Sequence, residues 1–167
     1  MKKIFTVVLA LLIVALFSVF ALGSGENSDS SDQGSGSATS SQSDNTNIGD
    51  YTLVIDSCRL AKSYDKKDVV IVKYRFTNNN DEDGASFSIA FDDKVYQNGV
   101  GLNSAYILDD SANYSSDNQT KNIQKGATLD VEVAYMLNDN TTDIVVEVKE
   151  FISFNDKKIT KTFKIAQ

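Results

Sequence analysis

The alternation of apolar and polar residues with a period of two constrains the fold of this chain most. In residues 129–137, Leu129, Val131, Val133, Tyr135 and Leu137 alternate with Asp130, Glu132, Ala134 and Met136. Successive side chains of a β-strand point to opposite faces, so this pattern predicts a strand with one buried face. Further candidate strands occupy residues 51–60, 68–78, 86–91, 94–96, 105–108, 144–148 (with a continuation to Ile152 and Phe154) and 159–165.

Three details refine this pattern. In residues 51–60 the apolar phase shifts from Leu53 and Ile55 to Cys58 and Leu60, which indicates a β-bulge or a change of sheet. Asn98-Gly99 suits a two-residue hairpin, because both residues tolerate positive φ. Lys161 is in phase with Ile159 and Phe163, and an inward charge is typical of an edge strand protected against further pairing.

About seven or eight short strands, separated by turn signals and without a convincing helical stretch, predict an all-β, immunoglobulin-like sandwich. We place this domain at residues 49–167, where the length suffices for one hydrophobic core. The polar stretch 109–122 is expected to form a surface loop.

The N-terminal residues predict export. Lys2 and Lys3 precede an apolar run, residues 4–22, in which only Thr6 and Ser18 are polar. Residues 1–23 are therefore either a signal peptide cleaved before Ser24 or a retained N-terminal membrane anchor. Residues 24–48 consist almost entirely of Ser, Gly, Asn, Asp, Gln and Thr, which predicts a disordered linker. The domain is expected outside the cell, either released or at the outer face of the cell membrane.

Composition excludes several function classes. The chain has no histidine and carries a net charge of −7. Catalysis by Ser-His-Asp or Cys-His arrangements is therefore excluded, and an acidic domain without a basic stripe is a poor partner for nucleic acid. Cys58 is the only cysteine, so no internal disulfide is available. We expect Cys58 to serve as a small buried hydrophobic residue.

Several short motifs together resemble a known family. They are Arg75-Phe76-Thr77-Asn78-Asn79, Val95-Tyr96-Gln97-Asn98-Gly99, Lys125-Gly126-Ala127-Thr128 and Val133-Ala134-Tyr135. Over roughly residues 51–150 the chain resembles a domain-of-unknown-function family found in exported proteins and lipoproteins of Gram-positive bacteria. The resemblance implies an immunoglobulin-like sandwich at the cell surface and assigns no catalytic or binding residue. Ser24 stands where a lipidated cysteine would be, so lipid anchoring is not expected.

Two groups of acidic residues invite a chemical interpretation. Residues 79–84, Asn-Asn-Asp-Glu-Asp-Gly, match the first half of a calcium loop, but Ala90 stands where a bidentate Glu is needed. We expect an ordinary solvated loop there and keep weak calcium binding as an alternative. Asp92-Asp93 and Asp109-Asp110 could suggest a glycosidase, but adjacent aspartates on a strand point to opposite faces.

Aromatic residues offer the clearest hint of binding. Tyr96, Tyr106, Tyr114, Phe87 and Phe91 are candidates for an exposed surface that contacts a glycan or a protein. Tyr114, within a Ser/Asn/Asp-rich stretch, is the one we expect to be exposed, whereas Tyr74 and Tyr135 are expected in the core.

The expected function is a non-catalytic extracellular or cell-surface module that binds a protein or a cell-wall polymer. The alternative is a secreted carrier with a small-ligand pocket between the sheets. We expect no enzyme activity and assign no catalytic, cofactor or metal residue. The ligand and the oligomeric state are left open.

Overall fold

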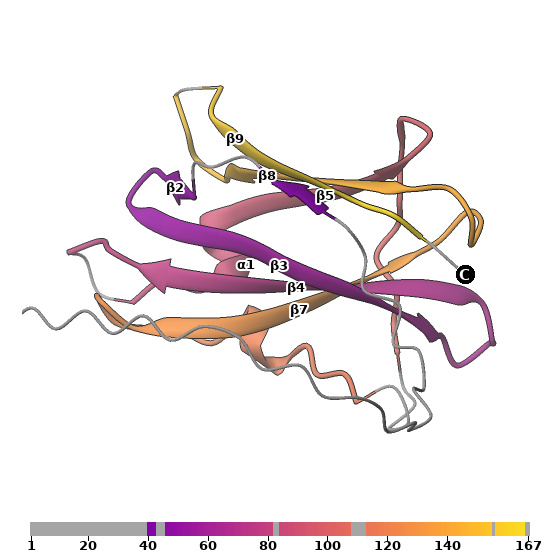
Figure 1. Ribbon diagram of the computed structural model, residues 1–167. Helices are drawn as coiled ribbons and strands as arrows, with labels where there is room; N and C mark the ends of the chain where they lie inside the picture. Colours follow the sequence, from indigo (N-terminus) through magenta and orange to yellow (C-terminus); the bar gives the residue numbers. More distant parts are fainter. Residues whose placement is uncertain (1–39, 43–45, 82–83, 108–112, 155, 166–167) are drawn as a thin grey trace, which may run out of the picture. The chain divides into compact units, whose positions relative to one another are not determined.

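The computed structural model describes residues 40–42, 46–81, 84–107, 113–154 and 156–165 (Figure 1). The expected export segment, residues 1–23, lies outside this set. Within the described part of the chain, no helix is long and apolar enough to cross a membrane.

Two antiparallel sheets form the folded domain (Figure 1). The first sheet has the order β2-β3-β4-β7, and the second has the order β1-β9-β8-β5-β6. This arrangement confirms the predicted all-β sandwich. The strands of the first sheet are β2 (Asn47–Ile48), β3 (Tyr51–Lys62), β4 (Asp68–Asn78) and β7 (Thr128–Met136). Those of the second are β1 (Ser40–Gln42), β5 (Phe91–Gln97), β6 (Val100–Gly101), β8 (Ile144–Glu150) and β9 (Lys158–Phe163).

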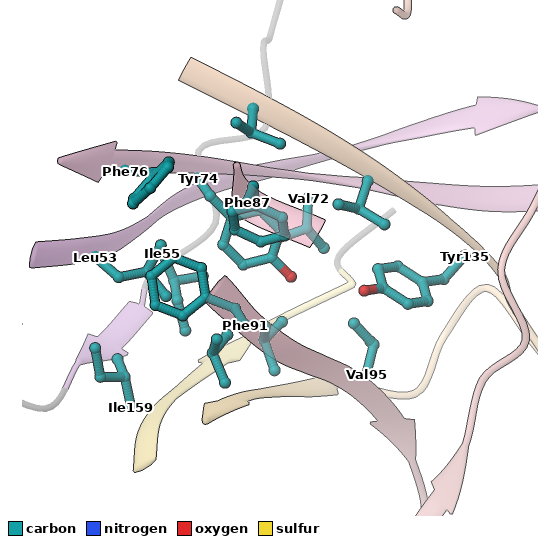
Figure 2. Packing of buried hydrophobic residues seen from close by; sticks show 14 of the residues in the cluster. Leu53, Ile55, Val72, Tyr74, Phe76, Phe87, Phe91, Val95, Tyr135 and Ile159 are labelled. Atoms are coloured by element: carbon teal, nitrogen blue, oxygen red, sulfur yellow. The ribbon is translucent and has the colours of Figure 1, made fainter. Parts of the chain in front are cut away.

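Aromatic rings fill much of the space between the sheets (Figure 2). Phe76 and Phe91 pack edge to face with ring centroids 5.3 Å apart, and Tyr51 contacts both rings. Phe87 packs against Phe91 and Tyr74, at 5.3 and 5.0 Å. Such pairs add to the hydrophobic stabilisation of the core, which is the dominant favourable contribution to folding. Tyr74 and Tyr135 are both buried, as expected.

Three short strand predictions are wrong. Residues 86–91 form helix α1 (Phe87–Ala90) and the start of β5, because one helical turn buries both Phe87 and Ala90. Residues 105–107 lie outside the strands, and the only strand-like pairing described beside them is an isolated bridge between Ser104 and Tyr135. Leu108 lies outside the described residues.

The third error concerns the end of β8. The strand stops at Glu150, and the following apolar residues are not its continuation. Phe151, Ile152 and Phe154 lie in the connection to β9 with 63%, 75% and 105% of their surface exposed.

The predicted β-bulge is present, but the role expected for Lys161 is wrong. The register between β3 and β4 shifts between Ile55 and Ser57. Lys161 lies on β9, which has strands on both sides, and its amine points inward. The Lys161 Nζ donates hydrogen bonds to the carbonyl oxygens of Ile55 (2.8 Å) and Asp56 (2.7 Å). Lys161 therefore donates hydrogen bonds to carbonyl groups at the bulge and does not protect an edge strand.

The pairing of strands begins earlier than the expected domain boundary at residue 49. Within the predicted linker, β1 pairs with β9 and β2 pairs with β3. Strand pairing uses backbone groups, which a Ser- and Asn-rich sequence supplies as well as an apolar one. Ile48 is also buried in the core.

Two turns are fixed by particular residues. Asn98 and Gly99 have φ values of 50° and 75° and connect β5 to β6, which confirms the predicted hairpin. The buried Gln97 side chain ties the turn between β7 and β8 to the sandwich. Its Nε2 donates to the carbonyl oxygens of Asp139 (3.1 Å) and Thr142 (2.8 Å), and its Oε1 accepts from the Asn138 amide (2.8 Å).

Candidate functional site

The outer edge of β7 is closed by side-chain amides rather than by another strand. The Asn118 Nδ2 donates to the carbonyl oxygen of Asp130 at 2.8 Å, and the Gln119 Nε2 donates to that of Glu132 at 2.6 Å. Both amides belong to the short 3-10 helix η2 (Asp117–Gln119). The described part of the expected surface loop, residues 113–122, therefore docks on the sheet through these two amides and satisfies carbonyl groups that an edge strand would leave open.

A second segment, residues 102–107, covers the rest of this edge. The Ala105 amide donates to the Ala134 carbonyl oxygen, and the Met136 amide donates to the Asn103 carbonyl oxygen, each at 2.8 Å. Ala105 and Ala134 belong to a second apolar cluster, together with Val69 and Ile71 of β4. This cluster is separate from the main core.

Between these two docked segments lies a hollow with a volume of about 400 Å³. Ala134 and Val133 of β7 contribute to its lining, as does Ala105. The other lining residues combine aromatic rings with hydroxyl and amide groups: Ser104, Tyr106, Ile107, Tyr114, Ser116 and Gln119. Apolar and aromatic walls with a few placed polar groups are typical of ligand-binding sites.

The two tyrosines of the hollow are held differently. Tyr106 is 82% exposed, so its ring is free to contact a ligand. Tyr114 is half-buried against the second apolar cluster, and its hydroxyl accepts a hydrogen bond from the Gln119 Nε2 at 3.2 Å. Burial raises the pKa of Tyr114 above its usual value, so this hydroxyl is protonated at neutral pH.

The aromatic surface predicted from the sequence is therefore partly wrong. Tyr106 and Tyr114 meet at one hollow, but Phe87 and Phe91 are core residues, and Tyr96 lies on β5. Tyr114, expected to be exposed, is half-buried. The unbroken apolar run Val69–Val72 of β4 was the sequence signal that both faces of this sheet are covered. A strand buried on one face only would alternate apolar and polar residues.

Of the acidic doublets, Asp92-Asp93 diverges as expected. Asp92 pairs with Lys94 at 2.8 Å, whereas Asp93 accepts hydrogen bonds from the hydroxyls of Tyr135 and Tyr74, the latter at 3.3 Å. Figure 2 shows both tyrosine hydroxyl groups within the core. Burial raises the pKa of Asp93, although both hydrogen bonds oppose the shift. Asp109 and Asp110 lie outside the described residues.

The candidate calcium loop is described only in part. Asp81 pairs with Lys125, and the Asn79 Nδ2 donates to the Thr52 hydroxyl at 2.9 Å. Glu82 and Asp83 lie outside the described residues. Among the residues that the structure describes, no three or more His, Cys, Asp or Glu side chains are grouped to hold a metal ion.

Cys58 is half-buried and packs against the main core, close to its expected role. Burial raises the pKa of its thiol to about 11, and the positive charge of Lys161 lowers it by less. A protonated thiol is a poor nucleophile at neutral pH.

Comparison with known proteins identifies the family. A family model described as a domain of unknown function (DUF5067) matches residues 26–150. A predicted lipoprotein from Staphylococcus aureus has a similar structure, with a TM-score of 0.56 and 20% identity over 77% of this chain and 94% of that one.

A predicted lipoprotein from Bacillus subtilis is similar over 77% of this chain and 39% of that one, with a TM-score of 0.53 and 18% identity. No curated protein matches the chain. The resemblance noted in the sequence is confirmed: this chain belongs to the DUF5067 family of domains of unknown function.

Proposed function

We propose that this protein is an exported, non-catalytic surface module that binds a cell-wall polymer or a surface protein in the hollow beside β7. The single observation that carries the proposal is that Tyr106 and Tyr114 both line that hollow. An exposed ring offers a flat apolar face at low entropic cost, because a tyrosine has few rotatable bonds.

The chemistry of the lining supports binding without catalysis. Among the described residues around the hollow, the polar groups are the hydroxyls of serine and tyrosine and the amide of Gln119. These groups donate and accept hydrogen bonds but supply neither a general base nor an activated nucleophile. The sheet provides a rigid floor, since Ala134 and Val133 belong to the paired strand β7.

The packing between the sheets favours this proposal over a small-ligand carrier. A carrier needs an apolar cavity between the sheets, but that space holds the ring contacts of Phe76, Phe87 and Phe91. The hollow lies instead over the second apolar cluster, outside the main core.

Two observations support a location outside the cell. The lysines at positions 2 and 3, followed by the apolar run 4–22, form an export signal or an anchor. The two similar structures come from proteins described as predicted lipoproteins. Export is tested by measuring the intact mass of the protein in membrane and medium fractions: a mass starting near Ser24 in the medium indicates release, and the full-length mass in the membrane indicates retention.

Binding is tested by co-sedimentation with isolated Gram-positive cell walls, before and after removal of wall proteins. Tyr106→Ala should weaken binding by about tenfold, which is typical of an aromatic contact residue. Tyr64→Ala is the matched control, because Tyr64 is also exposed but lies in the turn after β3. Equal binding by both variants and the unchanged protein would contradict the assignment of the hollow.

A further inference from the structure

The connection between β8 and β9 exposes three large apolar side chains close together in the sequence. Phe151, Ile152 and Phe154 follow one another within four positions, and each is mostly or fully exposed. The Phe151 amide donates to the Ala90 carbonyl oxygen at 2.9 Å, which places the connection beside α1. Ile89 of α1 is also exposed. We call Phe151, Ile152, Phe154 and Ile89 the apolar tip.

From this tip we infer that the domain contacts a lipid bilayer, with the side chains of Phe151, Ile152 and Phe154 inserted at the interface between the headgroups and the acyl chains. Three large, exposed apolar side chains on one connection suit a deformable apolar medium. Aromatic and aliphatic side chains of this kind partition into the interface of a bilayer, where part of their surface leaves water.

The charged residues near the apolar tip limit the depth of insertion. Lys149 and Lys158 face each other across β8 and β9 at the base of the connection. Lys158 pairs with Glu147 at 2.8 Å, and Asp92, opposite Lys149 on the other side, pairs with Lys94. With Glu150 at the end of β8, this base carries three positive charges (Lys94, Lys149 and Lys158) and three negative charges (Asp92, Glu147 and Glu150). These groups stay in the headgroup region, while lysine stems can extend along the apolar surface.

The length of chain before the domain permits this orientation. This step rests on the proposed anchoring of residues 1–23. Ser40 pairs with Phe163, and Gln42 pairs with Lys161, so the chain enters at the end of β9 that lies away from the apolar tip. Residues 24–39 reach at most roughly 55 Å, whereas the six residues of β9 span only about 20 Å. An anchored chain can therefore run back along β9 and bring the tip to the membrane.

A single tryptophan gives a direct test, because the chain has none. The protein is used without its first 23 residues, so that the apolar run does not itself bind lipid. Every strand that the structure describes and both apolar clusters lie at or after residue 40, so removing residues 1–23 takes away none of them. The Phe154→Trp variant is mixed with vesicles of phosphatidylcholine, with and without phosphatidylglycerol. We expect its emission to shift to shorter wavelength and to be quenched by brominated lipid.

The Tyr64→Trp variant is the matched control. Tyr64 is exposed in the turn that follows β3, whereas Gly49, just before β3, lies against the Glu150 side chain that precedes the tip. The two reporter positions therefore lie near opposite ends of β3. If the emission of the Tyr64→Trp variant shifts as strongly as that of the Phe154→Trp variant, the binding is non-specific adsorption and the proposal is overturned.

Replacing the three apolar side chains of the connection tests the same point by a second measurement. Phe151→Ser, Ile152→Ser and Phe154→Ser together should lower vesicle co-sedimentation by roughly a hundredfold, since each side chain contributes about fivefold when partly buried. Phe154→Ser alone should lower it by about fivefold and keeps the test valid if the triple variant does not fold.

Unchanged vesicle binding of the serine variants, or no response of the Phe154→Trp variant to either vesicle type, would overturn the proposal. A shift in the emission of the Phe154→Trp variant with wall proteins but not with lipid would replace the bilayer by a protein partner. Tyr106 is not part of the apolar tip, so the two proposals can fail separately. If the protein does not bind lipid but binds cell walls through Tyr106, the proposed function stands and the lipid contact is refuted. If it binds lipid through the tip but does not bind cell walls, the lipid contact stands and the proposed function is refuted.

Discussion

Replacing Lys161 by methionine tests whether one buried amine supports the bulge in β3. The side chain is inward-facing and only 5% exposed. Its Nζ donates to the carbonyl oxygens of Ile55 and Asp56, at 2.8 and 2.7 Å, and lies 4.9 Å from the centroid of the Phe163 ring. Methionine keeps most of the apolar stem but removes the charge and both donors, so packing changes little while the hydrogen bonds are lost.

The expected loss of stability follows from the two hydrogen bonds. A hydrogen bond to a charged group contributes about 1.5–3 kcal/mol to the free energy of unfolding, so two contribute about 3–6 kcal/mol. The variant no longer buries an ammonium group, and this returns part of that amount. Burial lowers the pKa of Lys161, which is consistent with a desolvation cost. We therefore expect the free energy of unfolding to fall by about 2–4 kcal/mol, a large share of the total for a domain of this size.

Urea unfolding monitored by circular dichroism measures this difference. With a slope of about 1–3 kcal/mol per molar urea, the midpoint should fall by roughly 1–2 M. Lys164→Met is the matched control, because Lys164 lies three positions later and is exposed. Its midpoint should stay close to that of the unchanged protein. If Lys161→Met proves as stable as the control, the amine contributes nothing net at the bulge, and the reasoning is refuted.

Three further predictions concern buried polar groups. Gln97→Leu leaves the amides and carbonyls of the turn between β7 and β8 without their partners and should lower the free energy of unfolding by about 2–4 kcal/mol, measured by urea unfolding; a loss under about 0.5 kcal/mol would contradict the role given to the amide. Burial raises the pKa of Asp93 in the folded state, so its contribution to stability is present at low pH and is lost as the pH rises through the folded pKa. Thermal unfolding should show Asp93→Asn gaining stability relative to the unchanged protein as the pH rises from about 4 to 7; a gap between the two proteins that does not vary with pH would refute this. Cys58, with a pKa raised from 9.0 to about 11, should react with a disulfide reagent at pH 8 about a hundredfold more slowly in the folded protein than in urea, and equal rates would contradict its burial.

The sequence predicted those parts of the fold that depend on local alternation and turn chemistry. The period-two pattern of β7 and the positive φ of Asn98-Gly99 follow from residues close together in the chain, and both are confirmed. The shifted phase around Ile55 likewise predicted the bulge. These features need no knowledge of the partner strands, because side-chain direction and backbone φ are local properties.

Local patterns were misleading where tertiary contacts decide the outcome. The sequence predicts a strand that includes Phe87 to Phe91, but one helical turn buries both Phe87 and Ala90 in the core. Polar residues near 40 and 47 read as linker, but backbone pairing with β9 and β3 takes them into the sheets. The apolar run after β8 reads as more strand, but Phe151 and Ile152 are exposed.

The candidate site could not be predicted from the sequence, because it too depends on tertiary contacts. Tyr106 and Tyr114 are brought to one hollow because amides at Asn118 and Gln119 satisfy carbonyls of β7, a strand later in the chain. The role of Lys161 depends on β3, more than a hundred residues earlier. The sequence alone determined that the chain forms a β-sandwich, since alternation and turn residues are local, and its apolar N-terminal run predicts export. Only the tertiary structure decided which side chains meet, because hydrogen bonds and packing join residues that no local pattern relates.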